Sequence, residues 1–252
     1  MILGPMILNV KGLEKSFDDK AVLRGIDLEV YRSQIVALIG SSGSGKSTLL
    51  RTINLLEEIS DGQIFLNYQD ISDPRIDQDQ IRRQIGLVFQ AYNLFAHLSI
   101  EENITLALRH VKGMKADAAK AKALALLDRI GLADKADSYP DKLSGGQQQR
   151  TAIMRAVALE PTLLLLDEVT SALDPELVGE VLELIRDLKA GGTSILMATH
   201  ELSFARDVAD WVVFLDGGVI IEEGPAGEFF SNPQNPRTVE FLQRLRRRAG
   251  DQ

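Results

Sequence analysis

A glycine-rich segment between a short apolar run and a predicted helix constrains the fold of this chain more than any other feature. Residues 40–47 read Gly-Ser-Ser-Gly-Ser-Gly-Lys-Ser and fit G-x-x-x-x-G-K-[ST] in full. The unbroken apolar run Ile35–Ile39 precedes them and predicts a buried parallel strand, which feeds a helix that starts near Ser47. A strand, a glycine-rich turn and a helix in this order indicate an α/β fold.

The same segment predicts a phosphate site. Its glycines let the backbone bend around an anion with N–H groups pointing inward, and the helix N-terminus adds partial positive charge. Lys46 can reach terminal phosphates, and the Ser47 hydroxyl is placed to bind Mg²⁺. The alternative, an ordinary Gly/Ser turn, is disfavoured because Lys46-Ser47-Thr48 follows at the right offset. The predicted phosphate-binding residues are Gly40, Ser41, Ser42, Gly43, Ser44, Gly45, Lys46, Ser47 and Thr48.

An apolar strand that ends in two acids is the second chemical feature. Leu163–Leu166 predicts a buried strand, which delivers Asp167 to the sheet edge where ligands bind in open α/β folds. There Asp167 can hold a metal ion through water, and Glu168 can orient or deprotonate an attacking water. Taken alone, the pattern is equally compatible with solvated acids at a strand end. Together with the glycine-rich segment, it favours nucleotide hydrolysis.

The remaining sequence extends this core. Alternating apolar residues before position 31 predict antiparallel strands with one buried face. Residues 92–158 are expected to be mostly helical, since Ala116–Leu127 is rich in strong helix formers at helical spacing. The other predicted elements are a strand at Ile85–Phe89, a helix at Pro175–Lys189, a strand at Ser194–Ala198, a hairpin of Trp211–Leu215 and Val219–Ile221, and a last helix from Pro236 into Arg244–Arg248.

Composition excludes several alternatives. The 252 residues include no cysteine, which excludes disulfides and thiolate metal sites. The net charge of −8 argues against nucleic acid as a partner, because phosphate backbones require a dense basic face. No stretch approaches the roughly 20 apolar residues of a spanning helix. Any role at a membrane is therefore expected to be peripheral.

Leu143-Ser144-Gly145-Gly146-Gln147 resembles the LSGGQ signature of the ABC ATPase family. The resemblance extends from about Leu8 to Leu242 and includes further motifs in the family's order. These are Phe17 as the adenine-stacking aromatic, Gln90 as the Q-loop glutamine, Ser171-Ala172-Leu173-Asp174 as the D-loop and His200 as the switch histidine. One departure is Val169, where the family usually has a proline after the Asp-Glu pair.

The resemblance implies a fold and a division of the chain. The fold is α/β: a P-loop NTPase core with a mostly parallel sheet, an N-terminal antiparallel β subdomain and an inserted helical subdomain. Residues 1–252 form a single ABC ATPase domain, with 1–91 and 159–252 as the nucleotide-binding core and 92–158 as the helical signature subdomain.

The resemblance also implies roles for individual residues, with ATP and Mg²⁺ as cofactors. It implies that Glu168, His200 and Gln90 are catalytic, and that Ser47, Gln90 and Asp167 hold the metal. ATP is bound by Phe17 and residues 40–48, and from a second copy by Ser144, Gly145, Gly146, Gln147 and Asp174. The two copies pair head to tail, so that Ser144 and Gly146 of one copy touch the γ-phosphate held by Lys46 of the other.

Each of these assignments has a structural alternative. Ser144 can be the N-cap of an ordinary helix, which is predicted from Gln147 onward. His200, like His97 and His110, can be a core or surface histidine without a chemical role. Phe17 can belong to the hydrophobic core. The tail Arg244–Arg248 is interpreted as a solvated helix end rather than a lipid contact.

Softer similarities favour the polar amino acid importer branch. They are Asp174–Leu182, Phe229–Pro233 and Arg237–Leu242. The resemblance implies integral membrane permease subunits as partners, a solute-binding protein as an indirect partner, and a peripheral location at the cytoplasmic face of a bacterial cell membrane. Tyr92, Leu94 and Phe95 are expected to be exposed for permease docking. The alternatives are an importer ATPase for another small solute and an ABC ATPase that acts without a transporter.

Overall fold

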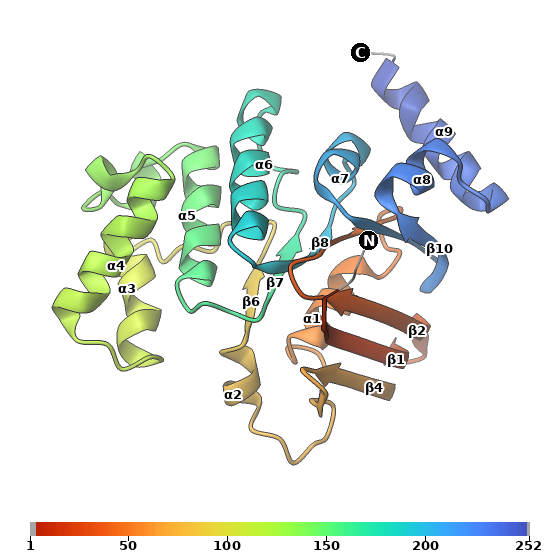
Figure 1. The fold of residues 1–252 in the computed structure, drawn as a ribbon, viewed down its shortest axis with the longest axis horizontal. Coiled ribbons are helices and arrows are strands. Elements are labelled where there is room, and N and C mark those ends of the chain that lie inside the picture. Colours follow the sequence, from red (N-terminus) through yellow and green to blue (C-terminus); the bar gives the residue numbers. More distant parts are fainter. Residues whose placement is uncertain (1–3, 251–252) are drawn as a thin grey trace.

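The computed structural model describes residues 4–250 (Figure 1). Its strands are β1 Met6–Phe17, β2 Lys20–Tyr31, β3 Ile35–Ile39, β4 Asp61–Leu66, β5 Gln69–Asp70, β6 Ile85–Val88, β7 Leu163–Asp167, β8 Ser194–Ala198, β9 Trp211–Asp216 and β10 Val219–Pro225. Its helices are α1 Lys46–Ile53, α2 Gln78–Arg82, α3 Ile100–His110, α4 Ala116–Arg129, α5 Gly145–Val157, α6 Pro175–Ala190, α7 Leu202–Val208, α8 Ala226–Ser231 and α9 Pro236–Gly250, with short 3₁₀ turns at Ala133–Lys135 and Pro140–Lys142.

A six-stranded sheet in the order β10-β9-β3-β8-β7-β6 forms the core. Its pairs are parallel except for the β9–β10 hairpin. Every residue of β3, β7 and β8 is buried, as expected of strands that are covered on both faces. Because the strands are parallel, their carboxyl ends meet at one edge, where β3, β7 and β8 deliver the residues of the predicted site.

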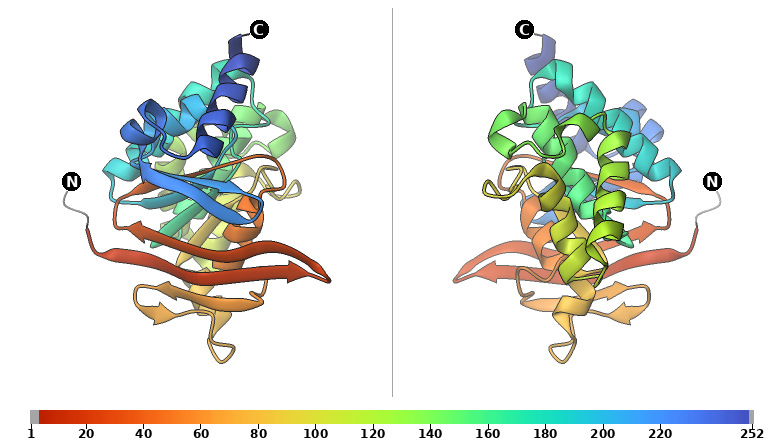
Figure 2. Two further views of the ribbon diagram at one scale, coloured as in Figure 1. Left: turned by 90° about the vertical axis from the view of Figure 1, so that its right-hand side faces the viewer. Right: turned by 90° about the vertical axis from the view of Figure 1, so that its left-hand side faces the viewer.

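Successive side chains of the central strands serve two separate hydrophobic cores. Val36 and Leu38 of β3 pack with α1 and the four-stranded antiparallel sheet β2-β1-β4-β5. Ile35, Ala37 and Ile39 pack with the helices on the other face. Figure 1 shows α5, α6 and α7 along one side of the main sheet and α1 with the second sheet on the other, and Figure 2 shows the same layers edge-on. The predicted α/β class and the antiparallel N-terminal sheet are confirmed.

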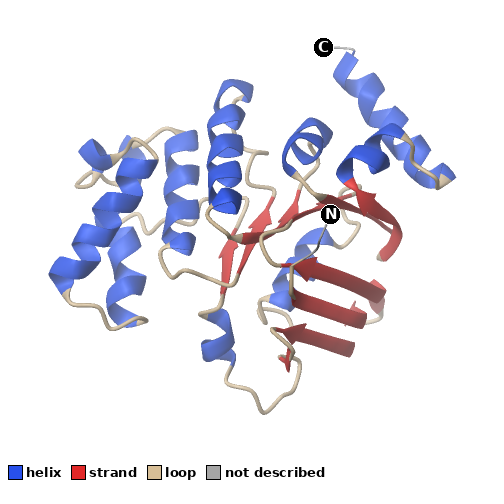
Figure 3. Cartoon of the chain, in the orientation of Figure 1, coloured by secondary structure: helices blue, strands red, loops and turns tan. Residues whose placement is uncertain are grey.

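Residues 92–158 contain α3, α4, α5 and the two 3₁₀ turns, with no strand in this fully described segment (Figure 3). The expected helical character is therefore confirmed, while its status as a separate subdomain stays a prediction. Helix α5 begins at Gly145, two residues before the predicted start. The difference arises because Ser144 Oγ accepts from Gln147 N and Gln147 Oε1 accepts from Ser144 N, which completes a capping box.

The chain ends in elements that the sequence predicts with small errors of extent. Strand β10 runs to Pro225 rather than Ile221, and α9 continues to Gly250. The side chains of Arg246, Arg247 and Arg248 lie outside the described residues, so the interpretation of the basic tail is not resolved by contacts. No helix between residues 4 and 250 has the length and apolar character that crossing a membrane requires.

The turn of the β9–β10 hairpin provides a test of the fold. Gly217 and Gly218 both have positive φ, at 58° and 82°, but an added Cβ at Gly218 would lie 2.3 Å from Val22 O, whereas one at Gly217 meets nothing within 4 Å. We expect Gly217→Ala to lower the free energy of unfolding by about 1 kcal/mol, the cost of a left-handed alanine. Gly218→Ala should lower the free energy of unfolding by about 3 kcal/mol or more, because the backbone at Val22 or at the turn must also move. Urea unfolding measures both, and equal losses would contradict this packing.

Candidate functional site

The glycine-rich loop between β3 and α1 adopts a backbone that requires glycine. Gly45 has φ 109°, and an added Cβ would lie 2.7 Å from Leu23 Cδ2. At Gly40 a Cβ would lie 2.1 Å from Leu215 O, on the neighbouring strand β9. Helix α1 then starts at Lys46, one residue before the expected position. The loop therefore presents a helix N-terminus to an anion at the carboxyl edge of the sheet.

Lys46 lies at the centre of the site, with only 4% of its surface exposed. Its Nζ donates to Gly40 O at 3.0 Å and to Ser41 O at 3.2 Å. Burial lowers the pKa of the ammonium, and the nearby charges of Glu168 and Asp167 oppose that shift. The chain thus holds a desolvated positive charge that is only partly compensated by its neighbours.

Glu168 and His200 meet beside this ammonium. Glu168 Oε1 lies 2.6 Å from His200 Nε2 and 3.8 Å from Lys46 Nζ. His200 Nε2 is also 3.5 Å from Lys46 Nζ. The structure brings these three predicted site residues together, and the His200 side chain is half-buried with a carboxylate partner. His97 and His110, by contrast, are exposed.

Glu168 occupies an unusual backbone position. Its φ is 52°, in the left-handed region that non-glycine residues rarely adopt. Its amide N donates to Ala198 O, and its carbonyl accepts from the amide N and the hydroxyl of Ser171. Val169, which follows, is buried in the main core. These contacts fix the strained residue between two packed strands.

Ser47 and Asp167 form an adjacent pair of oxygen ligands. Ser47 Oγ donates to Asp167 Oδ1 at 2.8 Å. Burial raises the pKa of Asp167, and the hydrogen bond from Ser47 opposes that shift. A hydroxyl and a carboxylate suit Mg²⁺, which usually takes one or two protein ligands beside phosphates and waters. The residues present therefore fit the ion, although no group of three or more His, Cys, Asp or Glu ligands occurs within residues 4–250.

The remaining loop residues surround this centre. Ser41 Oγ donates to Asp216 Oδ1 at 3.2 Å, and Ser44 is buried with no hydrogen-bond partner for its hydroxyl among the described residues. Ser42 and Gly43 are exposed and Thr48 is half-buried. Asp216 was missed by sequence reasoning, because nothing in the β9–β10 turn indicates that it reaches a serine 175 positions away. The Ser44 hydroxyl, buried in the phosphate loop without a partner among the described residues, could donate a hydrogen bond to a bound anion.

Three further predicted residues lie near the edge but outside this cluster. Gln90 follows β6 and is exposed. It lies beside the end of β7, because Val88 pairs with Leu166. Phe17, at the end of β1, is 42% exposed, with Lys15 Nζ 4.5 Å from its ring centroid. The alternative that Phe17 belongs to the core is therefore wrong. Asp174 is exposed and immediately precedes α6.

The signature segment stands apart from the phosphate loop. None of the interactions described for residues 4–250 joins residues 143–147 to residues 40–48. Ser144 is exposed at the N-cap of α5, so the capping alternative is confirmed without excluding a ligand role. Gly145 and Gly146 are closely packed, since an added Cβ would lie 2.7 Å from Tyr92 Oη and 3.1 Å from Leu177 Cδ1, so that these side chains would have to shift. The N-terminus of α5 is thus exposed, as an anion site at a helix N-terminus would have to be.

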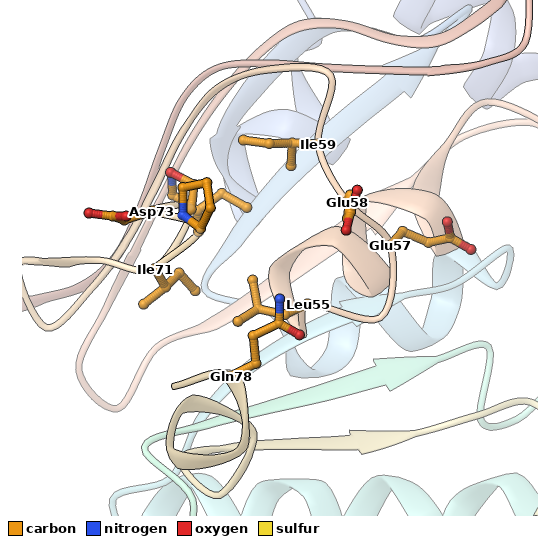
Figure 4. Close-up of a pocket in the computed structure, with 10 residues that line it drawn as sticks. Leu55, Glu57, Glu58, Ile59, Ile71, Asp73 and Gln78 are labelled. Carbon is orange, nitrogen blue, oxygen red and sulfur yellow. The ribbon is translucent and has the colours of Figure 1, made fainter. Parts of the chain in front are cut away.

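A separate pocket lies at the opposite end of α1 from the phosphate loop (Figure 4). Its volume is about 280 Å³, with Leu55, Ile59 and Ile71 among its apolar lining residues and Glu57, Glu58 and Asp73 among its acids. It contains none of the residues of the cluster around Lys46. The chemical groups of the site therefore gather at the strand ends and not in this cavity.

Comparisons with known proteins agree with this geometry. The family model described as "ABC transporter" matches residues 23–171. A glutamine transport ATP-binding protein of Geobacillus stearothermophilus is 48% identical, over 92% of this chain and 96% of that protein. An L-cystine transport system ATP-binding protein of Escherichia coli is 50% identical, over 94% and 98%. A glutamate transport ATP-binding protein of Corynebacterium glutamicum is 46% identical, over 95% and 99%.

Two solved structures are similar in fold. An ATP-binding cassette in a dimeric post-hydrolysis state, bound to ADP and Pi, has a TM-score of 0.78 and 31% identity, and the match covers 87% of this chain and 99% of that chain. The ADP conformation of another ATP-binding cassette of an ABC transporter has a TM-score of 0.83 with 24% identity, over 94% and 98%. The second likeness concerns the fold alone.

The buried Asp167 carboxyl gives a test that needs no ligand. Burial raises the pKa of Asp167, so the folded chain binds a proton at this carboxyl more tightly than the unfolded chain does. In the unfolded chain an aspartate has a pKa of about 3.9. The contribution of the carboxyl to stability is therefore fully present below that pH and is lost as pH rises through the raised pKa. Asp167→Asn retains an oxygen that accepts from Ser47, and should raise the free energy of unfolding at neutral pH. Urea unfolding should show this gain shrinking toward about pH 4, and a loss of stability at neutral pH would contradict the assigned burial.

Proposed function

The chain belongs to the ABC transporter family as an ATP-binding, ATP-hydrolysing subunit, and on that premise we propose that it powers the import of polar amino acids. The observation that carries the proposal is the cluster of Lys46, Glu168 and His200 beside the Ser47–Asp167 pair. A buried cation, a carboxylate and a neighbouring histidine at one sheet edge can bind phosphate, position a water and accept its proton, which are the tasks of phosphoryl transfer.

ATP binding would replace contacts that the site residues make with one another by contacts with the phosphates. The Lys46 ammonium, now bonded to Gly40 O and Ser41 O, would bind the terminal phosphates instead. The backbone N–H groups of the loop and the N-terminus of α1 stabilise the same negative charge. Phe17, which is exposed on the second sheet, would stack on the adenine ring. Its neighbour Lys15 holds the ring by a cation–π contact at 4.5 Å.

Ser47, Asp167 and Gln90 would hold Mg²⁺, which neutralises charge on the phosphates when it is bound. Ser47 and Asp167 are already in hydrogen-bond contact, so little rearrangement is needed to direct both oxygens to one point. Gln90 lies at the end of the adjacent strand pair. Its amide oxygen is the one ligand of this set that must move inward.

Glu168 would orient and deprotonate the attacking water. Its Oε1 lies 2.6 Å from His200 Nε2 and 3.8 Å from Lys46 Nζ. Phosphate binding to Lys46 removes one of these partners and leaves the carboxylate free to accept a proton. His200 would then donate to the γ-phosphate, and so hold the group on which the water acts.

A second copy of the chain would complete the site. The N-terminus of α5 is an exposed anion site that does not meet the phosphate loop of its own chain. Head-to-tail pairing would bring Ser144, Gly145, Gly146 and Gln147 to the γ-phosphate held by Lys46 of the partner, with Asp174 at the same contact. The dimeric cassette bound to ADP and Pi is a similar protein in which two copies pair.

An elongated groove would receive the membrane permease. It has a volume of about 730 Å³ and lies between β6, α3 and α5, with Leu87, Leu106 and Pro161 among its lining residues. Phe95, which is 43% exposed, lines it, with the Arg155 guanidinium 5.5 Å from its ring centroid. Leu94, which was expected to be exposed, instead packs against the main core. An apolar groove with a cationic rim suits an amphipathic helix.

The amino acid assignment rests on the relatives, whose names state transport of glutamine, L-cystine and glutamate. The permease would be the integral membrane partner, and a solute-binding protein would deliver the substrate to it. This chain would then lie at the cytoplasmic face of the inner membrane of a bacterium. The substrate pocket itself belongs to those partners.

The proposed base is tested by Glu168→Gln. The glutamine has the same size and still contacts His200, but it accepts no proton, so ATP turnover should fall by about 100-fold or more. Nucleotide affinity should stay within a factor of about three, because the phosphate loop is untouched. ATP-bound dimers should accumulate, as measured by light scattering. Glu201→Gln, adjacent to His200 on the same edge, is the matched control.

The same pair of variants tests the transport assignment. Isolation from detergent-solubilised membranes should recover a permease with the wild-type chain, and its reconstitution should give ATP-dependent uptake of a polar amino acid. Uptake should fall with hydrolysis in Glu168→Gln and remain in Glu201→Gln. Normal turnover in Glu168→Gln would exclude it as the base. Normal ATPase activity without uptake of any polar amino acid would overturn the substrate class alone.

A further inference from the structure

Gln149 is a fully buried amide whose polar atoms bond to nothing in the described part of the chain. It lies in α5, two residues after the signature, with none of its surface exposed. Neither Oε1 nor Nε2 has a hydrogen-bond partner between residues 4 and 250. A buried amide without partners destabilises the state in which it occurs. Such a group is expected to find its partners in another state of the protein.

Helical spacing identifies the surroundings of Gln149. Gly145 and Ala156, at four residues before and seven after, share its face of α5. A Cβ added at Gly145 would lie 2.7 Å from Tyr92 Oη and 3.7 Å from Leu173 Cδ2. Ala156 Cβ would lie 3.5 Å from one added at Gly86 in β6. Gln149 therefore faces the loop that follows Gln90 and the segment that follows Glu168.

Of the three glutamines in this run, Gln149 is the one whose amide is buried without a partner among the described residues. Gln148 Nε2 donates to Leu143 O at 3.1 Å, and Gln147 Oε1 completes the capping box. Both are satisfied within the signature helix and its N-cap. Only the third glutamine of the run is directed toward the segments that carry the proposed catalytic groups.

A series of contacts connects the surroundings of Gln149 to the proposed phosphate site. Glu168, 3.8 Å from Lys46 Nζ, must exchange that partner when phosphate binds. Its carbonyl accepts from Ser171 N, and Ala172 O in the same turn accepts from Tyr92 Oη at 3.5 Å. Tyr92 in turn closes over Gly145. A shift at Glu168 is thus transmitted through one short turn to the loop that borders Gln149.

We propose that Gln149 is a positioning residue, whose amide bonds to the backbone of residues 90–93 or 169–173 only in the ATP-bound dimer. It would thereby tie the signature helix to the loop of Gln90 when the site is loaded. The inference rests on the proposed function, since it concerns the ATP-driven state of that same site. Gln149 touches neither nucleotide nor water in this scheme.

The test is Gln149→Leu, which keeps the approximate size and removes both polar atoms. The variant and its control are both made in the Glu168→Gln background, so that ATP-bound dimers persist. Three measurements are made on the full chain: urea unfolding without nucleotide, ADP binding to the monomer, and the ATP concentration that gives half-maximal dimerisation. Gln148→Leu is the matched control, because it removes an amide that already has its partner.

We expect Gln149→Leu to unfold at the same or a higher urea concentration and to bind ADP within a factor of about two. The ATP needed for half-maximal dimerisation should rise by about fivefold to tenfold, the loss of one or two hydrogen bonds. Gln148→Leu should be destabilised without nucleotide. A merely structural role of Gln149 would change unfolding and leave the ATP dependence unaltered.

Two outcomes overturn the proposal while leaving the proposed function intact. Unchanged ATP dependence in Gln149→Leu would mean that the amide has no partner in the dimer. Lower stability without nucleotide, or failure to fold, in both Gln149→Leu and Gln149→Met would mean that it already has partners in the unloaded chain. If Glu168→Gln alone does not dimerise on ATP, the proposed function falls and the inference falls with it.

Discussion

The buried ammonium of Lys46 is the constraint on which the rest of this structure depends. Desolvation disfavours its charge, and the chain supplies two carbonyls and a carboxylate at 3.8 Å to compensate. A phosphate group would satisfy the same charge more fully, because it carries several anionic oxygens. A bound nucleotide could therefore replace these contacts of Lys46. Glu168 is among the groups that the replacement would release, so under the proposed roles nucleotide binding also frees the general base.

The parallel sheet brings the residues around Lys46 together from distant parts of the sequence. Strands β3, β7 and β8 are adjacent in space, although Ile39, Asp167 and Ala198 lie far apart in the sequence. Since their carboxyl ends share one edge, the loop, the acids and His200 meet without any long side chain having to span a gap. All three strands are buried on both faces, so packing on either side supports this edge. The signature helix is attached to the same core through β6 but presents its N-terminus elsewhere, so the proposed site needs a second chain to complete it.

Sequence patterns predicted the elements that carry the site, because each pattern follows from local physics. The apolar run Ile35–Ile39 indicated a strand covered on both faces, and the glycines indicated a loop that no larger residue could form. The patterns could not predict contacts between distant segments, such as Ser41 with Asp216. Nor could they distinguish Gln149 from its two neighbouring glutamines, since only the packing of α5 buries one amide and exposes or satisfies the others. The predicted start of α5 is two residues late, although Ser144 and Gln147 fit the S-x-x-[EQ] capping pattern, which places the first helical residue at Gly145.

ATP-driven dimerisation of Ser144→Asp beside Ser144→Asn, both in the Glu168→Gln background so that ATP-bound dimers persist, tests most directly whether two chains share one phosphate site. Both residues cap a helix as well as serine does, so α5 should remain intact in each. Only aspartate places a negative charge where the partner's γ-phosphate must dock, and like charges repel strongly where water is excluded. If two chains share ATP, Ser144→Asp should bind ATP as a monomer but form no dimer, whereas Ser144→Asn should still dimerise. Light scattering measures the dimer in both variants. Equal dimerisation of the two variants would contradict a shared phosphate site.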